Sequence, residues 1–181
     1  MSHIRVTGTP PEPNIIAFYY RVADMFNNVV LRTMYRAKNI RDNNNESQVD
    51  DWAISEDEKD FFNITIEKAI HDAFNTVMKM TTSVTDALLL NVAEITINAE
   101  TESADEKCYG FKVRDHEAYN ANILNLVDDG IKNMVESYVM MEWYKTVGQN
   151  EELQKWLGEY MKNREILVTK RLFQLRKPFI S

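Results

Sequence analysis

Glycine, proline and cysteine are scarce in this chain, and each shortage excludes a class of fold. The chain has 5 glycines and 4 prolines among 181 residues, against usual shares of about 7% and 5%. Pro10, Pro11 and Pro13 lie near one end and Pro178 near the other, so no proline breaks a helix between them. Because Cys108 is the single cysteine, an internal disulfide is excluded. We therefore expect long, uninterrupted helices.

Signals for export, membrane insertion and ligand binding are missing as well. No apolar run approaches the roughly 18 residues of a membrane span, and residues 1–14 lack the apolar core of a signal peptide. Cysteine and histidine form no zinc-binding cluster, and no two glycines lie close enough together to make a phosphate-binding loop. We expect a protein of a reducing compartment with no membrane span, no metal and no cofactor.

Apolar residues recur at helical spacing in four blocks, and this periodicity predicts four long helices. The first is expected to start at an N-cap residue, Asn14, and to bury a stripe that includes Met34. A polar stretch at 42–52 then predicts a loop, and a short helical piece is expected at 86–93. The four predicted helices span about 14–41, 55–78, 117–147 and 151–175.

Two local signals place helix ends. Ser55 and Glu58 form a capping-box pattern, the clearest start signal in the chain. Gly148 provides a stop and Asn150 an N-cap for the next helix. Because only two residues connect the last two long helices, an antiparallel helical hairpin is predicted.

Between 94 and 114 the apolar residues no longer follow the helical spacing but alternate with polar ones, which predicts two short strands paired as a β-hairpin. Ile97 lies in the first alternating segment, and Tyr109 and Phe111 lie in the second. The predicted fold class is thus mainly α: a four-helix bundle-like body with a small β-hairpin inserted between the second and third long helices. We expect a single domain over 1–181, with an N-terminal arm at 1–13 and a C-terminal tail at 176–181.

Charge is unevenly distributed along the chain. Net charge is +4 over 1–41, −7 over 42–60, −7 over 61–150 and +3 over 151–181, which sums to −7. One interpretation is that the basic ends pack against the acidic middle or are simply solvated. The other is that Lys170, Arg171, Arg176 and Lys177 contact a polyanion or an acidic partner surface. Specific nucleic-acid recognition has no motif to support it.

No group of residues indicates catalysis. His71 is expected on a polar helix face, and Asp128 and Asp129, adjacent in a helix, diverge by about 100° and so are expected to be surface charges. Cys108 has no nucleophile motif around it and is expected to be a buried or half-buried small side chain. We predict that the protein is not an enzyme.

Adjacent aromatic residues are the main interface signal. Tyr19 and Tyr20, and also Trp143 and Tyr144, are neighbours in predicted helices, so they cannot all face one core. Either the extra rings are partly exposed in a monomer, or they lie in a subunit interface, where such residues are enriched. The residues predicted to form an interface are Tyr19, Tyr20, Trp143, Tyr144, Lys170, Arg171, Arg176, Lys177, Ile97, Tyr109 and Phe111.

The last two helices show a family resemblance. The aromatic-rich segment 138–148, the segment 153–161 and the basic segment 170–178 together resemble the C-terminal helical hairpin of head–tail connector proteins from tailed phages, particularly phages of gut Bacteroidetes. The resemblance implies a small helical protein that assembles as a ring beneath the portal and joins capsid to tail around the DNA channel. The abundant asparagine is compatible with an AT-rich phage genome.

Two functional hypotheses follow. The first is a virion structural protein, a head–tail connector or ring subunit assembled in the host cytoplasm, whose partners are copies of itself and the portal and tail proteins, with non-specific proximity to DNA. The second is a helical adaptor or regulatory module of a phage or mobile element that binds a single partner protein. The neighbouring genes and the oligomeric state would separate them.

Overall fold

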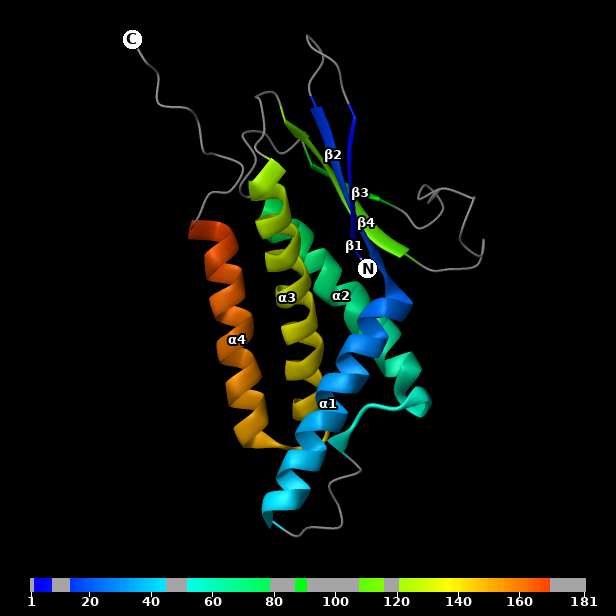
Figure 1. The fold of residues 1–181 in the computed structure, drawn as a ribbon, viewed down its shortest axis with the longest axis vertical. Helices are drawn as coiled ribbons and strands as arrows, with labels where there is room; N and C mark the ends of the chain where they lie inside the picture. The colour runs from blue at the N-terminus through cyan, green and yellow to red at the C-terminus, as the bar shows by residue number, and fades with distance from the viewer. Residues whose placement is uncertain are drawn as a thin grey trace.

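The computed structural model of the chain describes residues 2–7, 14–44, 52–78, 87–90, 108–115 and 121–169. They form four long helices beside a four-stranded antiparallel sheet (Figure 1). The helices are α1 (Val22–Asn44), α2 (Lys59–Met78), α3 (Ala121–Thr146) and α4 (Asn150–Thr169), with a short 3-10 helix, η2 (Glu56–Glu58), before α2. The strands are β1 (Ser2–Thr7), β2 (Asn14–Arg21), β3 (Ala87–Leu90) and β4 (Cys108–Asp115).

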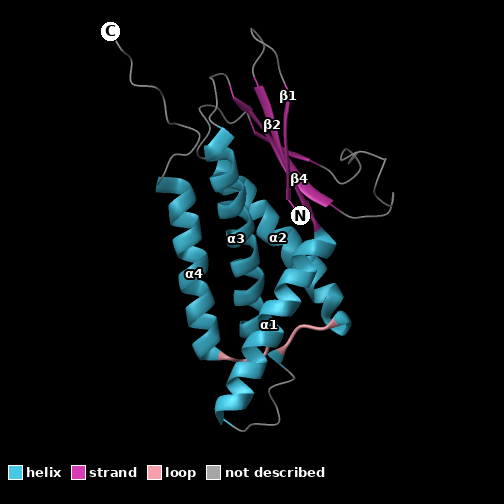
Figure 2. Ribbon diagram, viewed as in Figure 1, coloured by secondary structure: helices cyan, strands magenta, loops and turns pink. Residues whose placement is uncertain are grey.

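The predicted fold class is confirmed. The described chain is mostly helical (Figure 2), and in chain order an antiparallel pair of strands, β3 and β4, comes between the second and third long helices. Helix α3 is central: it packs most extensively against α4, then against α2, and also contacts α1. The helices cover one end and one side of the sheet, so a single core joins the two parts.

The hairpin of α3 and α4 turns where the sequence predicted. Gly148 has φ +74°, a conformation that glycine adopts without strain. Its amide donates to the Lys145 carbonyl at 3.4 Å, and the Gln149 amide donates to the Tyr144 carbonyl at 2.9 Å. This pair of bonds is a Schellman motif, which satisfies the last carbonyls of α3. Helix α4 begins at Asn150, one residue before the predicted start at 151, so the residue predicted as the N-cap is the first residue of the helix.

The predicted capping box is present. The Ser55 side chain accepts from the Asp57 amide at 3.2 Å, and Glu58 accepts from the Ser55 amide at 2.8 Å. The first turn it caps is η2, which leads directly into α2. These bonds satisfy amides that a helix start leaves without partners.

The sheet has the strand order β1-β2-β4-β3. Phe18 of β2 pairs with Ile4 of β1 and Phe111 of β4, and Tyr20 pairs with Tyr109. Ile16, Phe18 and Tyr20 are buried in the core that the helices share, so their side of the sheet is the inner face.

The predicted start of the first helix is wrong. Residues 14–21 form strand β2, Asn14 pairs with Asp115 instead of capping a helix, and α1 begins at Val22. A short apolar run rich in β-branched and aromatic residues is compatible with either a helix or a strand. This run is a strand because it pairs with two neighbouring strands. At its other end α1 continues to Asn44, three residues into the expected loop.

Two further expectations need correction. Residues 87–90 form strand β3 where a short helix was expected, because they pair with β4. Part of the expected N-terminal arm, residues 2–7, forms strand β1. The second strand of the predicted hairpin is β4, but it pairs with β2 and β3; the first strand, with Ile97, lies outside the described residues, as does the tail at 176–181.

Candidate functional site: the outward face of α1 and the carboxylates beneath it

Helix α1 exposes three large apolar side chains on one face. Leu31, Met34 and Tyr35 have exposed fractions of 53%, 53% and 67%. Residues three and four apart are neighbours on a helix surface, so these three form one strip. We call it the α1 outward face. The expectation that Met34 belongs to a buried stripe is wrong, because the core side of α1 is formed by residues such as Phe26, Val29 and Thr33.

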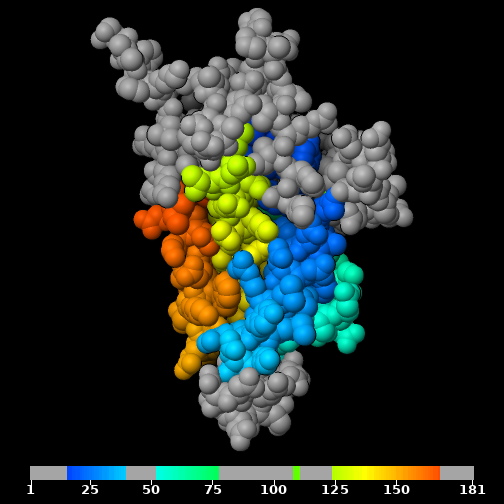
Figure 3. All heavy atoms as spheres, viewed as in Figure 1, coloured from blue at the N-terminus to red at the C-terminus, as the bar shows by residue number. Residues whose placement is uncertain are grey.

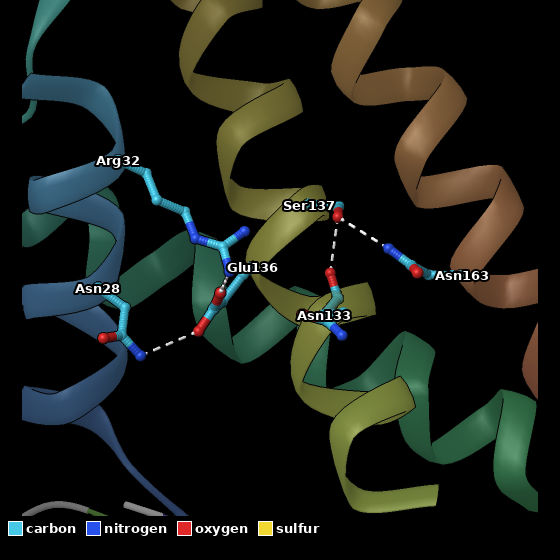
Figure 4. A network of polar contacts seen from close by, with 6 residues as sticks. All are labelled: Asn28, Arg32, Asn133, Glu136, Ser137 and Asn163. Carbon is cyan, nitrogen blue, oxygen red and sulfur yellow. Dashed lines mark hydrogen bonds and ion pairs between the residues drawn. The ribbon is translucent and has the colours of Figure 1, made fainter. Parts of the chain in front are cut away.

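The side of α1 toward α3 is polar and paired. Arg32 forms an ion pair with Glu136 of α3 at 2.8 Å, and the Asn28 amide donates to the same carboxylate at 3.1 Å. The Glu136 side chain is fully buried, whereas Arg32 remains 42% exposed. Figure 4 shows both α1 residues pointing toward Glu136. A buried carboxylate with a cation and an amide donor holds the two helices in one register.

A second ion pair ties α1 to α4. Arg36 donates through its Nε atom to the buried carboxylate of Glu152 at 2.6 Å and is ion-paired with it. The hydrogen bond to Glu152 raises the pKa of the Arg36 guanidinium above its usual value. Lys155 lies 3.6 Å from the same carboxylate. Together with Glu136, these contacts fix α1 on the α3–α4 hairpin.

Polar side chains also link the remaining helices. Ser137 of α3 donates to the Asn133 carbonyl at 2.6 Å and accepts from Asn163 of α4 at 3.2 Å, on the side of α3 away from Glu136 (Figure 4). The Tyr160 hydroxyl of α4 is hydrogen-bonded to Asp72 of α2. The helices therefore form a body with fixed relative positions, on which α1 presents its outward face.

Helix α4 has a smaller apolar surface of its own. Leu157 and Met161, four residues apart, are 37% and 54% exposed. We call this pair the α4 patch. Figure 3 shows α1 and α4 on the same face of the molecule, with α3 visible between their upper parts and α1 lying against α4 lower down. Two other exposed apolar side chains, Ile64 on α2 and Leu126 on α3, belong to neither strip.

The residues predicted for an interface are dispersed. Tyr20, Tyr109, Trp143 and Tyr144 are buried inside the chain, and Tyr19 is half-buried. Phe111 lies in β4, paired with Phe18. The other predicted interface residues lie outside the described ranges: Ile97, Lys170, Arg171, Arg176 and Lys177.

The argument from adjacent aromatic residues is corrected for Trp143 and Tyr144. Both are buried because α3 is surrounded by its neighbours and has core on several sides. The Trp143 ring packs edge-on against Phe61 at 5.5 Å, and its Nε1 donates to the Trp52 carbonyl at 2.8 Å. For Tyr19 and Tyr20 the reason is different: in a strand, successive residues face opposite sides.

The expectation that Asp128 is a surface charge is also wrong. Asp128 is buried on α3, whereas Asp129 is exposed. Burial, and the charge and hydrogen bonding of Asp128, raise the pKa of the Tyr20 hydroxyl well above its usual value. The predictions for Cys108, which is buried, and for His71, which is exposed on α2, are confirmed.

The described residues form neither a metal-binding cluster nor a membrane span. No three acidic, histidine or cysteine side chains among them gather as metal ligands would. None of the described helices combines the length and the apolar character that a membrane crossing requires. The exposed apolar side chains of α1 and α4 are candidate contact surfaces.

In comparisons with known proteins, no protein-family model, curated protein or solved structure matches this chain.

Proposed function

We propose that the protein is a non-enzymatic assembly protein whose subunits join one another through the α1 outward face. The observation that supports this is the exposure of Leu31, Met34 and Tyr35 on a helix that buried ion pairs hold in place. Contiguous apolar surface on a soluble protein marks an interaction site. A preorganised helix loses little conformational entropy on association.

The proposed partner is a second copy of the chain, in a head-to-tail arrangement. The α1 outward face and the α4 patch lie on different helices, and each offers large apolar side chains. A contact between two different surfaces of identical subunits is heterologous, and such contacts close into rings when the rotation between subunits allows. Met34 and Tyr35 of the α1 outward face and Met161 of the α4 patch are residue types that suit an interface.

The particular form that we propose is a head–tail connector of a tailed phage. The resemblance of the last two helices to such connectors supports it, and the α3–α4 hairpin supplies a rigid helical body. In that setting the portal and tail proteins are further partners and the virion is the place of function. The alternative proposal is an adaptor module in which the α1 outward face binds one unrelated partner protein.

Light scattering coupled to size-exclusion chromatography tests the self-assembly. We expect a mass that is a multiple of 21.2 kDa and rises with protein concentration toward a closed ring. A Leu31→Ser/Met34→Ser variant is expected to run as a monomer with an unchanged circular dichroism spectrum, because both side chains are already exposed.

The matched control is Ile64→Ser, which removes an equally exposed apolar side chain from α2. It should leave the mass unchanged. A wild-type chain that stays monomeric at every concentration, alone and with a portal protein, would refute the connector and favour the adaptor. Equal loss of assembly in the control would refute the α1 outward face as the contact.

A further inference from the structure

The methionine side chains that the structure describes divide between the interior and the surface. Three are buried, with exposed fractions of 2% or less: Met25, Met134 and Met140. Met141 is half-buried and packs against the core. Met34 of α1 and Met161 of α4 are instead 53% and 54% exposed. Among the described methionine side chains, these two are therefore the ones that solvent reaches freely.

Each of the two exposed methionines belongs to one of the two apolar surfaces. Met34 lies three residues after Leu31 on the α1 outward face, and Met161 lies four residues after Leu157 in the α4 patch. One turn before Met161, the surface at Gly158 is open, because a Cβ atom there would meet nothing within 4 Å. Both proposed contact surfaces thus present a thioether sulfur to solvent.

The single thiol of the chain is protected from solvent. Cys108 is only 2% exposed. A cysteine is oxidised when its thiolate is accessible, and a buried cysteine is inert. Within the described part of the chain, an oxidant in solution therefore meets Met34 and Met161 before any other sulfur.

Peroxides convert a thioether to a sulfoxide in one two-electron step. The sulfur lone pair attacks one peroxide oxygen, an S–O bond forms and the O–O bond breaks. The proton of the attacked oxygen passes to the departing oxygen, so methionine is oxidised and hydrogen peroxide is reduced to water. The product is a polar side chain, which disrupts an interface that depends on apolar methionine.

We infer that Met34 and Met161 are modification sites for oxidants of the peroxide class, and that their sulfoxides prevent subunits from joining. The first part follows from exposure and does not depend on assembly. The second part rests on the proposed function, in which both side chains are buried on contact. The oxidant therefore acts on subunits before they join, and methionine sulfoxide reductases reverse the modification.

Oxidation at these two positions leaves the fold intact. A sulfoxide at Met34 or Met161 keeps its oxygen in water, because both side chains are on the surface of a helix. A sulfoxide at Met134 or Met140 would place a polar group inside the core, which costs stability. The secondary structure thus distinguishes surface oxidation from damage to the core.

Peptide mass mapping after timed exposure of the full chain to hydrogen peroxide tests the modification sites. We expect Met34 and Met161 to gain one oxygen about tenfold faster than Met134 and Met140. The circular dichroism spectrum should stay unchanged while the first two are oxidised. Rates for Met34 and Met161 no faster than those for the two buried methionines would overturn the first part of the inference.

Size-exclusion chromatography with light scattering, at a concentration where the wild type assembles, tests the effect on assembly. Peroxide treatment should weaken wild-type assembly by about tenfold, and sulfoxide reductases with a thiol should restore it. A Met34→Leu/Met161→Leu variant keeps apolar side chains of similar volume, so it should assemble as the wild type does and be insensitive to peroxide. The matched control, Met140→Leu, removes a buried methionine and should remain as sensitive as the wild type.

Two outcomes would overturn the second part of the inference. One is unchanged assembly of a wild-type chain in which both sulfoxides have formed. The other is a Met34→Leu/Met161→Leu variant that peroxide affects as much as the wild type. A wild type that never assembles would refute the proposed function and, with it, the effect on assembly, whereas the peptide map would still decide the modification sites.

Discussion

Helices α1 and α3 place their side chains in opposite ways. Helix α3 buries charge: Glu136 is fully buried and Asp128 is 6% exposed. Helix α1 exposes apolar side chains: Tyr35, for example, is 67% exposed. In α1 the exposed apolar residues run along one side. Helix α1 meets α3 through the ion pair of Arg32 with Glu136, and it meets α4 through the ion pair of Arg36 with Glu152.

The comparison separates side chains that contacts within the chain explain from side chains that no such contact explains. A buried carboxylate is tolerated when a cation and a hydrogen-bond donor satisfy it, and Glu136 has both within the chain. The apolar strip of α1 has no such internal explanation, since the opposite side of α1 already supplies the core. The buried charges therefore account for how α1 is held, and we propose that the exposed strip is a contact surface for a second subunit.

The largest expected effect comes from leaving Glu136 without its cation. Arg32→Met should lower the free energy of unfolding by about 2–4 kcal/mol; the usual cost of breaking a buried pair is about 3–5 kcal/mol, and Arg32 is partly solvent-screened at 42% exposure. Adding Glu136→Gln to Arg32→Met should restore most of the lost free energy of unfolding, because the double variant has no buried charge at this position. Urea unfolding measures the free energy of unfolding of both variants.

Lys145→Met is the control for that pair. It breaks the exposed contact between Lys145 and Glu142 at 3.4 Å, which should cost less than about 0.5 kcal/mol. If Arg32→Met cost no more than this control, the view that Glu136 depends on α1 would be wrong.

Alkaline pH should destabilise the core next. Burial raises the pKa of the Tyr144 and Tyr20 hydroxyls above the ordinary value of 10.0. The unfolded chain then releases protons above pH 10 that the folded chain retains. Stability is therefore complete below pH 10 and falls above it, by up to about 1.4 kcal/mol per pH unit for each tyrosine.

Denaturant titrations at pH 9, 10 and 11 measure this slope. Tyr144→Phe should reduce it, because one buried hydroxyl no longer titrates. A slope that Tyr144→Phe leaves unchanged would contradict the assignment.

Two helical glycines provide a matched pair of smaller effects. A Cβ at Gly130 of α3 would lie 2.8 Å from Leu167 Cδ2 of α4, and Leu167 is fully buried, so Gly130→Ala should cost about 1–3 kcal/mol. At Gly158 of α4 nothing lies within 4 Å. Gly158→Ala should therefore stabilise by about 0.5–1 kcal/mol. If the melting temperatures of Gly130→Ala and Gly158→Ala shift in the same direction, close packing of α3 against α4 beside Gly130 would be disproved.

The last effect depends on acid pH and concerns the start of α2. Hydrogen bonds from the Ser55 side chain and amide lower the pKa of Glu58 below 4.5. The capping box thus adds stability that is present above about pH 4.5 and is lost as the pH falls through the lowered value. Ser55→Ala should cost about 1 kcal/mol at pH 7. The cost should shrink at pH 3, and an equal cost at both pH values would show that Glu58 plays no part.

The sequence predicted the elements that local chemistry determines. The capping box at Ser55, the Gly148 turn and the α3–α4 hairpin depend on residues that are close together in the chain. The number of long helices followed from apolar periodicity alone. These features need no knowledge of distant partners.

The incorrect predictions concern residues whose structure depends on segments that are distant in the sequence. Residues 14–21 are a strand because β1 and β4 flank them, and no local signal shows those neighbours. Asp128 is buried because Tyr20, more than 100 positions earlier in the chain, lies beside it. The periodicity does not predict the α1 outward face for a related reason: a helix that starts at residue 14 has a different core side, which places Met34 in the buried stripe, whereas Met34 is exposed.

Cross-linking of single-cysteine variants tests the central claim, that the α1 outward face of one subunit meets the α4 patch of the next, most directly. With Cys108 replaced by serine, Met34→Cys and Met161→Cys chains carrying different affinity tags are mixed and treated with a short bismaleimide. We predict cross-links between the two kinds of chain in preference to links within either kind. Links only between identical variants, or none at concentrations where the wild type assembles, would contradict the account.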